Sequence, residues 1–187
     1  MEKYQTNIHL TNAFGFRYLS CRKRENYFMT ESLLPKIKEL EKIYGTANSN
    51  AFGSAVFYEA IPEDKTVEEM ARKHYRDFIG DKWTTETENT WLSGWKNVYI
   101  RQPGKEPDIL NELDELTDPQ AKLSVPLLTE IITNAEQGRK FLAAVFDHPL
   151  VEKLTVNLVG DGDELSGIIV TGDFSDKNVC SVIGLLD

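Results

Sequence analysis

Apolar and polar residues alternate near the N-terminus in a pattern that predicts two strands. Phe14, Phe16 and Tyr18 are separated by single small or polar residues, which gives the two-residue period of a half-buried strand over residues 13–21. A shorter run at residues 6–10 is also extended in character, and a polar turn lies between the two. The pattern therefore predicts an N-terminal hairpin.

Two segments in the first half of the chain have the spacing of amphipathic helices. Between residues 30 and 45, apolar residues recur every three or four positions. The second helix follows a predicted strand at residues 51–61 and begins with Thr66 and Glu69, which have the spacing of a capping box. His74 lies on the apolar stripe of this helix.

The middle of the chain is polar and irregular at residues 82–94, and a strand is predicted at residues 95–102. A helical stretch of about forty residues follows. One of its helices is predicted over residues 124–134, with apolar residues at helical spacing. These residues are Leu127, Leu128, Ile131 and Ile132.

Three strands are predicted at the C-terminal end, over residues 153–159, 166–174 and 178–186. Because short polar segments join them, they form an antiparallel meander. The first connection, Gly160 to Glu164, is acidic, and Asp161, Asp163, Glu164 and Asp173 lie close together in sequence. Their spacing does not match a calcium-binding loop, so the segment is interpreted as a turn and not as a metal site.

The order of elements lacks the strict strand–helix alternation of a doubly wound parallel sheet. It favours a single α+β domain over residues 1–187, with a mostly antiparallel sheet, helices packed on one face, and the C-terminal three-stranded meander. A chain of this length forms one domain with a substantial core.

Composition narrows the functional classes. The chain is 41% hydrophobic and 27% charged, as in ordinary globular proteins, and no apolar run is long enough to span a membrane. No secretory signal is visible, so a cytoplasmic location is expected. The formal net charge is -9, and the acidic excess is concentrated in the second half, which disfavours nucleic-acid binding.

The sequence predicts no catalytic, metal or cofactor site. Cys21 and Cys180 each lie in an apolar segment, and neither belongs to a metal-binding motif. There is no nucleophile elbow, phosphate-binding loop or dinucleotide-binding motif. These absences do not decide whether the protein is an enzyme.

The charge pattern points to a basic protein partner. No basic residue occurs between residues 106 and 121, although this segment is rich in carboxylates that could steer a cationic surface. Trp91 and Trp95 are added as candidate contacts, because tryptophan is enriched in binding hot spots. The acidic candidates are Glu106, Glu112, Asp114, Glu115 and Asp118.

Two hypotheses follow. The first is a non-enzymatic binding or regulatory domain, for example an inhibitor or immunity-type protein, that engages a basic protein through this acidic surface. The alternative is a small-ligand-binding protein or enzyme with a pocket between sheet and helices. Its candidate residues are His74, Tyr75 and Tyr58, and a lone helical histidine is more often a buried structural residue. The sequence leaves the oligomeric state open.

Overall fold

The computed structural model describes residues 33–46, 53–160 and 166–186. Its centre is a five-stranded antiparallel sheet in the order β1-β5-β4-β3-β2, so β1 and β2 form the two edges. The strands are β1 (Gly53–Ala60), β2 (Lys96–Ile100), β3 (Val151–Val159), β4 (Ser166–Phe174) and β5 (Asn178–Leu186). The predicted C-terminal meander is confirmed: β4 and β5 have the predicted bounds, and β3 begins two residues before the predicted start at residue 153.

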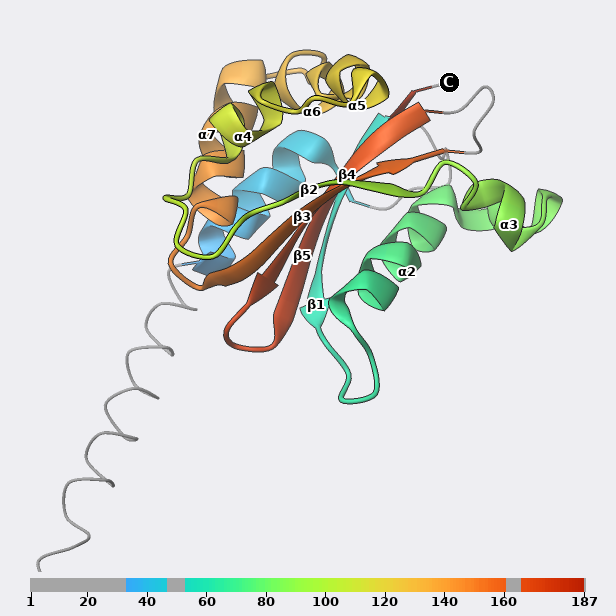
Figure 1. Cartoon of the computed structure of the whole chain (residues 1–187), viewed down its shortest axis with the longest axis horizontal. Coiled ribbons are helices and arrows are strands. Elements are labelled where there is room, and N and C mark those ends of the chain that lie inside the picture. The colour runs from blue at the N-terminus through green and yellow to red at the C-terminus, as the bar shows by residue number, and fades with distance from the viewer. Residues whose placement is uncertain (1–32, 47–52, 161–165, 187) are drawn as a thin grey trace, which may run out of the picture.

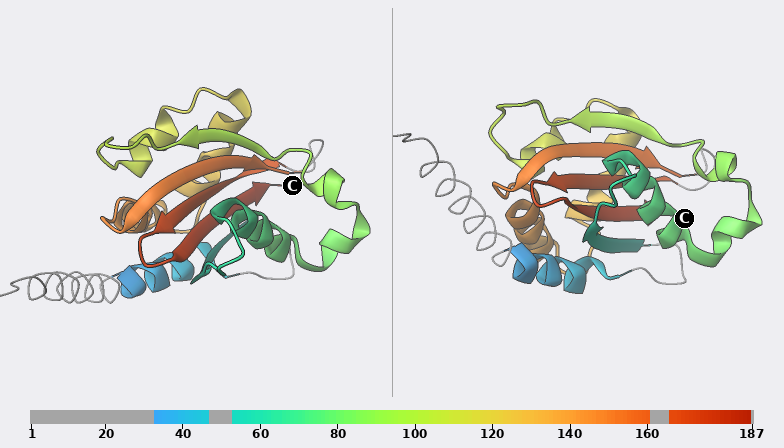
Figure 2. Two further views of the ribbon diagram at one scale, coloured as in Figure 1. Left: turned by 60° about the horizontal axis from the view of Figure 1, so that its bottom comes forward. Right: turned by 90° about the horizontal axis from the view of Figure 1, so that it is seen from below.

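Helices cover both faces of the sheet (Figures 1 and 2). The helical residues 33–44 and α7 (Ala135–Phe146) pack on one face, together with the short helices α4 (Ile109–Asp114), α5 (Pro119–Ser124) and α6 (Pro126–Thr129). The opposite face is covered by α2 (Val67–Ile79), the 3-10 helix η1 (Gly80–Thr85) and α3 (Glu88–Trp91). The expected packing on one face holds for the larger group of helices, whereas α2 packs on the other.

Strand alternation produces two separate apolar cores. In β4, Ile168 and Val170 point into the first core, beneath α4 to α7, while Ile169 points into the second core, beneath α2. Because neighbouring side chains of a strand point to opposite faces, each central strand contributes to both cores. This explains why β4 and β5 are buried along most of their length.

The helix α2 begins where the sequence predicts. The Thr66 side chain accepts a hydrogen bond from the Glu69 backbone N–H, and the Glu69 carboxylate accepts one from the Thr66 backbone N–H, so the capping box is complete. The predicted helix at 30–45 is confirmed over residues 33–44. The N-terminal hairpin and the acidic turn after Gly160 lie outside the described residues.

Two local predictions are wrong. The predicted helix at residues 124–134 ends at Thr129, because Glu130 leaves helical geometry with a φ of -133° and Ile131 donates its N–H back to the Pro126 carbonyl. Residues 82–94, expected to be irregular, contain the end of η1 and all of α3 instead. The Thr87 side chain caps α3 by accepting a hydrogen bond from the Thr90 N–H. The sequence prediction missed this cap, because the segment was read only as polar.

Close packing against the sheet fixes the position of α6. A Cβ added at Gly184 of β5 would lie 2.9 Å from the Leu127 Cβ and 3.0 Å from Leu128 Cδ2. The glycine therefore allows α6 to approach the strand at a distance that a larger side chain would prevent.

Candidate functional site

The acidic candidates divide between buried and exposed positions. Glu112 is only 1% exposed and lies in the first core, on the face of α4 that carries Ile109 and Leu113. It therefore does not belong to a partner-binding surface. Its position follows from helical periodicity, because residues three and four apart share a face of a helix.

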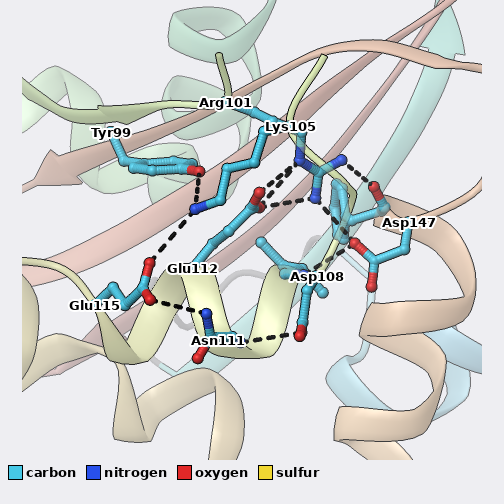
Figure 3. Close-up of polar contacts among 10 residues, drawn as sticks. Tyr99, Arg101, Lys105, Asp108, Asn111, Glu112, Glu115 and Asp147 are labelled. Atoms are coloured by element: carbon cyan, nitrogen blue, oxygen red, sulfur yellow. Dashed lines mark hydrogen bonds and ion pairs between the residues drawn. The ribbon is translucent and has the colours of Figure 1, made fainter. Parts of the chain in front are cut away.

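Arg101 compensates the buried Glu112 carboxylate (Figure 3). Its guanidinium donates to both Glu112 oxygens at 2.8–3.0 Å, to the Phe146 carbonyl at 2.8 Å and to the Asp147 carboxylate at 2.9 Å. Burial lowers the pKa of Arg101, but the bonds to Glu112 and Asp147 outweigh this effect and leave the pKa above its ordinary value. The cluster joins the end of β2 to α4 and to the end of α7, so its role is structural.

The remaining acids differ in how far their charge is compensated. Asp118 caps α5 through bonds from the Gln120 and Ala121 N–H groups, and it forms an ion pair with Lys96 at 2.7 Å. Glu115 is exposed and contacts Lys105 at 3.4 Å. Glu106 and Asp114 are also exposed, so part of the predicted acidic surface is accessible.

Two exposed aliphatic residues belong to the segments that follow α4, although the sequence pattern did not single them out as candidates. Leu123 is 77% exposed and Ile131 is 63% exposed, the two largest exposures among the large hydrophobic residues described. Leu123 follows Lys122 in sequence and Ile131 follows Glu130. Lys122 and Glu130 line, together with Asp114, a 160 Å³ cavity between α4, α5 and α6. We call this region the α4–α6 surface, defined by Glu106, Asp114, Glu115, Leu123, Glu130 and Ile131.

Buried hydrogen bonds hold the backbone of the α4–α6 surface in place. The Tyr44 hydroxyl, from the helix at 33–44, donates to the Leu128 carbonyl. Arg139 of α7 donates to the Thr129 carbonyl at 2.8 Å. Because these carbonyls end α6, the exposed Glu130 and Ile131 project from a segment that is fixed on two sides.

The tryptophan candidates belong to the second core. Trp91 is 5% exposed, stacks on Trp83 at 6.1 Å between ring centroids, and donates its indole N–H to the Trp83 carbonyl. Trp95 is half-buried beneath the Arg72 guanidinium, which lies 5.2 Å from its ring centroid. Both lie on the opposite face of the sheet from α4, so they do not join the acidic candidates in one surface.

The three pocket candidates do not converge on one cavity. His74 and Tyr75 lie on the face of α2 that packs on the sheet, and both are completely buried. Tyr75 belongs to the second core, and His74 stacks on Phe57 beside it. Tyr58 points to the other side of the sheet and packs edge-on against Phe174. The alternation along β1 accounts for this separation, because Tyr58 and Phe57 must point to opposite faces.

His74 nevertheless belongs to a polar relay that the sequence did not reveal. Its Nε2 lies 2.9 Å from Glu59 Oε1, and its Nδ1 lies 2.8 Å from Ser181 Oγ. Ser181 Oγ lies 3.1 Å from Thr171 Oγ1, and the imidazole stacks on the Phe57 ring. Outside the relay, Lys73 contacts Glu59 at 2.7 Å.

The protonation states along the relay follow from the Glu59 carboxylate. Burial raises the pKa of Glu59, but the bonds from Lys73 and His74 outweigh it and hold this pKa below its usual range. An ionised Glu59 accepts a hydrogen bond, so Nε2 of His74 carries the proton and Nδ1 of the neutral ring accepts from the Ser181 hydroxyl. This assignment leaves both ring nitrogens hydrogen-bonded in a fully buried position.

Carboxylate, imidazole and hydroxyl also form the nucleophilic triads of hydrolases. Here, however, Ser181 has no exposed surface and lies in the middle of β5 beneath α2. A substrate could not reach its hydroxyl without displacement of the helix. The relay is therefore interpreted as a structural link between α2 and the sheet.

The buried histidine predicts a pH dependence of stability. Burial lowers the pKa of His74, and neither the Glu59 contact nor the charge of Asp77 restores it, while Lys73 lowers it further. Unfolding therefore takes up a proton at pH values between the folded and unfolded pKa. We expect the free energy of unfolding to fall as the pH is lowered through about 6.5, the ordinary pKa of histidine.

Urea unfolding of the wild type and of His74→Gln over this pH range measures the effect. The free energy of unfolding of His74→Gln should decrease less than that of the wild type as the pH is lowered. Burial also lowers the pKa of His148, so His148→Gln should likewise reduce the decrease, but only by the contribution of His148. An unchanged slope in His74→Gln would contradict the assignment. The lowered pKa of Glu59 affects stability at lower pH. There, the contribution of the ionised Glu59 to the free energy of unfolding is lost as the carboxylate becomes protonated.

Within the described ranges, no three His, Cys, Asp or Glu side chains gather as a group that could hold a metal ion. Cys180 is a free, fully buried thiol whose pKa is raised by burial.

Asp173 lies near the end of β4, opposite Lys153 of β3 and far along the strand from the acidic turn. No helix in the described part of the chain has both the length and the apolar character needed to cross a membrane.

Comparison of the chain with models of protein families, with curated proteins and with solved structures finds no match.

Proposed function

We propose that the protein is a non-enzymatic binding or regulatory domain that engages a basic protein partner through the α4–α6 surface. The observation that carries this proposal is the exposure of Leu123 and Ile131, at 77% and 63%, in a region whose acidic residues Glu106, Asp114, Glu115 and Glu130 are also exposed. An inhibitor or immunity-type protein is one concrete form of such a domain. A cytoplasmic location belongs to the same proposal.

The composition of the surface resembles that of a protein–protein interface. Such interfaces combine an apolar centre with a polar rim, and a few apolar or aromatic residues provide most of the binding energy. Leu123 and Ile131 supply the apolar contacts, while Asp114 and Glu130, with Lys122, line the cavity between α4, α5 and α6. The partner is therefore expected to present aliphatic or aromatic side chains within a basic surface.

The fixed backbone of α6 supports the same conclusion. Ordering of flexible segments on binding reduces affinity, and a surface that is ordered in advance avoids this loss. The bonds from Tyr44 and Arg139 hold the carbonyls next to Glu130 and Ile131. The exposed carboxylates of the surface add attraction over longer distances and raise the association rate with a basic protein.

Affinity capture from lysate at low and high salt tests the proposal. The Debye length falls from about 10 Å at 0.1 M salt to about 3 Å at 1 M, so an acidic surface should retain a basic protein mainly at low salt. The double variant Asp114→Asn/Glu130→Gln should retain less of it. The matched control Asp64→Asn/Glu86→Gln removes two exposed acids elsewhere and should behave like the wild type.

A lysate in which the immobilised protein retains no partner at low salt would contradict the proposal. Equal losses in the two double variants would contradict the assignment to the α4–α6 surface, because they would indicate a response to net charge alone.

A further inference from the structure

The largest of the described cavities lies beside α2, on the opposite face of the sheet from the α4–α6 surface. Its volume is about 440 Å³, and α2 supplies the largest share of its lining. The rest comes from the end of β1, the loop that follows it, η1, α3 and the residue after α3. Sites for small ligands occupy about 300–1,000 Å³, so this cavity is of suitable size.

One part of the cavity wall is apolar and held in place. Trp83 lines it and is fixed by the stacked Trp91 ring and by an edge contact with Tyr75 at 5.9 Å. Met70, which is 2% exposed, and Leu92 add aliphatic surface. A rigid indole beside aliphatic side chains provides a stacking surface for a planar ring.

The charged part of the lining is basic in balance, although the whole chain has a net charge of -9. Its carboxylates come from Glu59, Glu69 and Glu88. Its cations are Lys65, Arg72, Lys73 and Arg76. The other described cavities lack this excess, since acidic residues equal or outnumber basic ones in each.

Ion pairs within the protein satisfy these cations unequally. Lys73 contacts Glu59 at 2.7 Å and Asp77 at 3.0 Å, and Arg72 contacts Glu68 at 2.8 Å. Among the residues that the structure describes, the one carboxylate that forms an ion pair with Arg76 is that of Asp77, whose Oδ1 lies 3.9 Å from the Arg76 Nε. The guanidinium fork of Arg76 is thus available for two parallel hydrogen bonds to a carboxylate or phosphate.

We propose that this cavity binds a small organic anion, in which a carboxylate or phosphate contacts Arg76 and an aromatic ring packs against Trp83. Arg72 lies one turn before Arg76 on α2, and both line the cavity. The proposal does not depend on the docking function of the opposite face.

Titration with defined aromatic anions tests this proposal by tryptophan fluorescence. Phenylacetate and phenyl phosphate represent the two kinds of anionic group, acetate and inorganic phosphate lack the ring, and phenethylamine carries the opposite charge. We expect a saturable change with at least one aromatic anion and none with phenethylamine. Arg76→Gln should weaken this binding about tenfold, because a charge-assisted pair of hydrogen bonds is lost.

Lys140→Gln is the matched control, because it removes an exposed cation from α7 on the other side of the sheet. It should bind like the wild type. The proposal is overturned if neither aromatic anion gives a saturable change, if phenethylamine binds equally well, or if the ring-free anions match the aromatic ones. Equal weakening in Arg76→Gln and Lys140→Gln also overturns it, since that result would reflect net charge only.

Discussion

Replacing Arg101 with alanine is expected to lower the free energy of unfolding by about 3–5 kcal/mol, because the buried Glu112 carboxylate would lose its compensating charge. The Glu112 side chain has no exposed surface and that of Arg101 is 8% exposed, so water cannot replace the guanidinium without a change in packing. The Phe146 carbonyl and Asp147 would lose partners as well. For a domain of this size, the expected decrease in melting temperature is about 2–4 °C per kcal/mol.

Two variants separate the buried charge from a general effect of lost basic residues. Lys105→Ala removes a neighbouring cation that contacts the exposed Glu115 and should change stability little. The double variant Arg101→Met/Glu112→Leu removes both charges and should recover most of the lost stability, since apolar pairs often replace buried ion pairs without loss. Calorimetry or urea unfolding measures all three. Similar stabilities of Arg101→Ala and Lys105→Ala would contradict the account of the cluster.

The second large effect is expected on partner binding. Replacing Leu123 and Ile131 together by serine should weaken binding of the basic partner by at least about tenfold, because truncation of a residue that acts as a hot spot at the centre of an interface costs more than about 1 kcal/mol. Both side chains are mostly exposed in the free protein. Their replacement should therefore leave stability within about 0.5 kcal/mol of the wild type. Titration calorimetry with the captured partner measures the affinity, and thermal unfolding measures the stability.

Leu34→Ser provides the matched control, because Leu34 is also exposed, at 40%, but lies near the start of the helix at residues 33–44. It should bind the partner as the wild type does. Retention of full affinity by Leu123→Ser/Ile131→Ser would exclude these side chains as the centre of the interface.

Local signals allowed much of the fold to be predicted from sequence. The capping box at Thr66 and Glu69 depends on residues only three positions apart, and it forms as expected. The C-terminal meander could also be predicted from the sequence, because the alternation of apolar and polar residues defines the strands and the short connections define their antiparallel order. The distribution of the helices between the two faces of the sheet could not be predicted, since the alternation within a strand does not show which helix covers which face.

Contacts between distant residues account for what the sequence did not reveal. His74 and Ser181 are 107 positions apart, and only the strand order brings Ser181 beneath α2. Ile131 continued an apolar helical spacing, yet the turn at Glu130 exposes it. The burial of Glu112, in contrast, could have been predicted from the sequence, because Glu112 shares a helical face with Ile109 and Leu116. This periodicity is a more direct guide to burial than the acidic residues near Glu112 in the sequence are to exposure.

Hydrogen–deuterium exchange of the protein, alone and with the basic partner retained at low salt, tests the docking proposal most directly. We predict slower exchange between residues 106 and 131, which include α4, α5 and α6, and unchanged exchange in α2. Protection confined to α2 or to the edge strands, with none in residues 106–131, would contradict it.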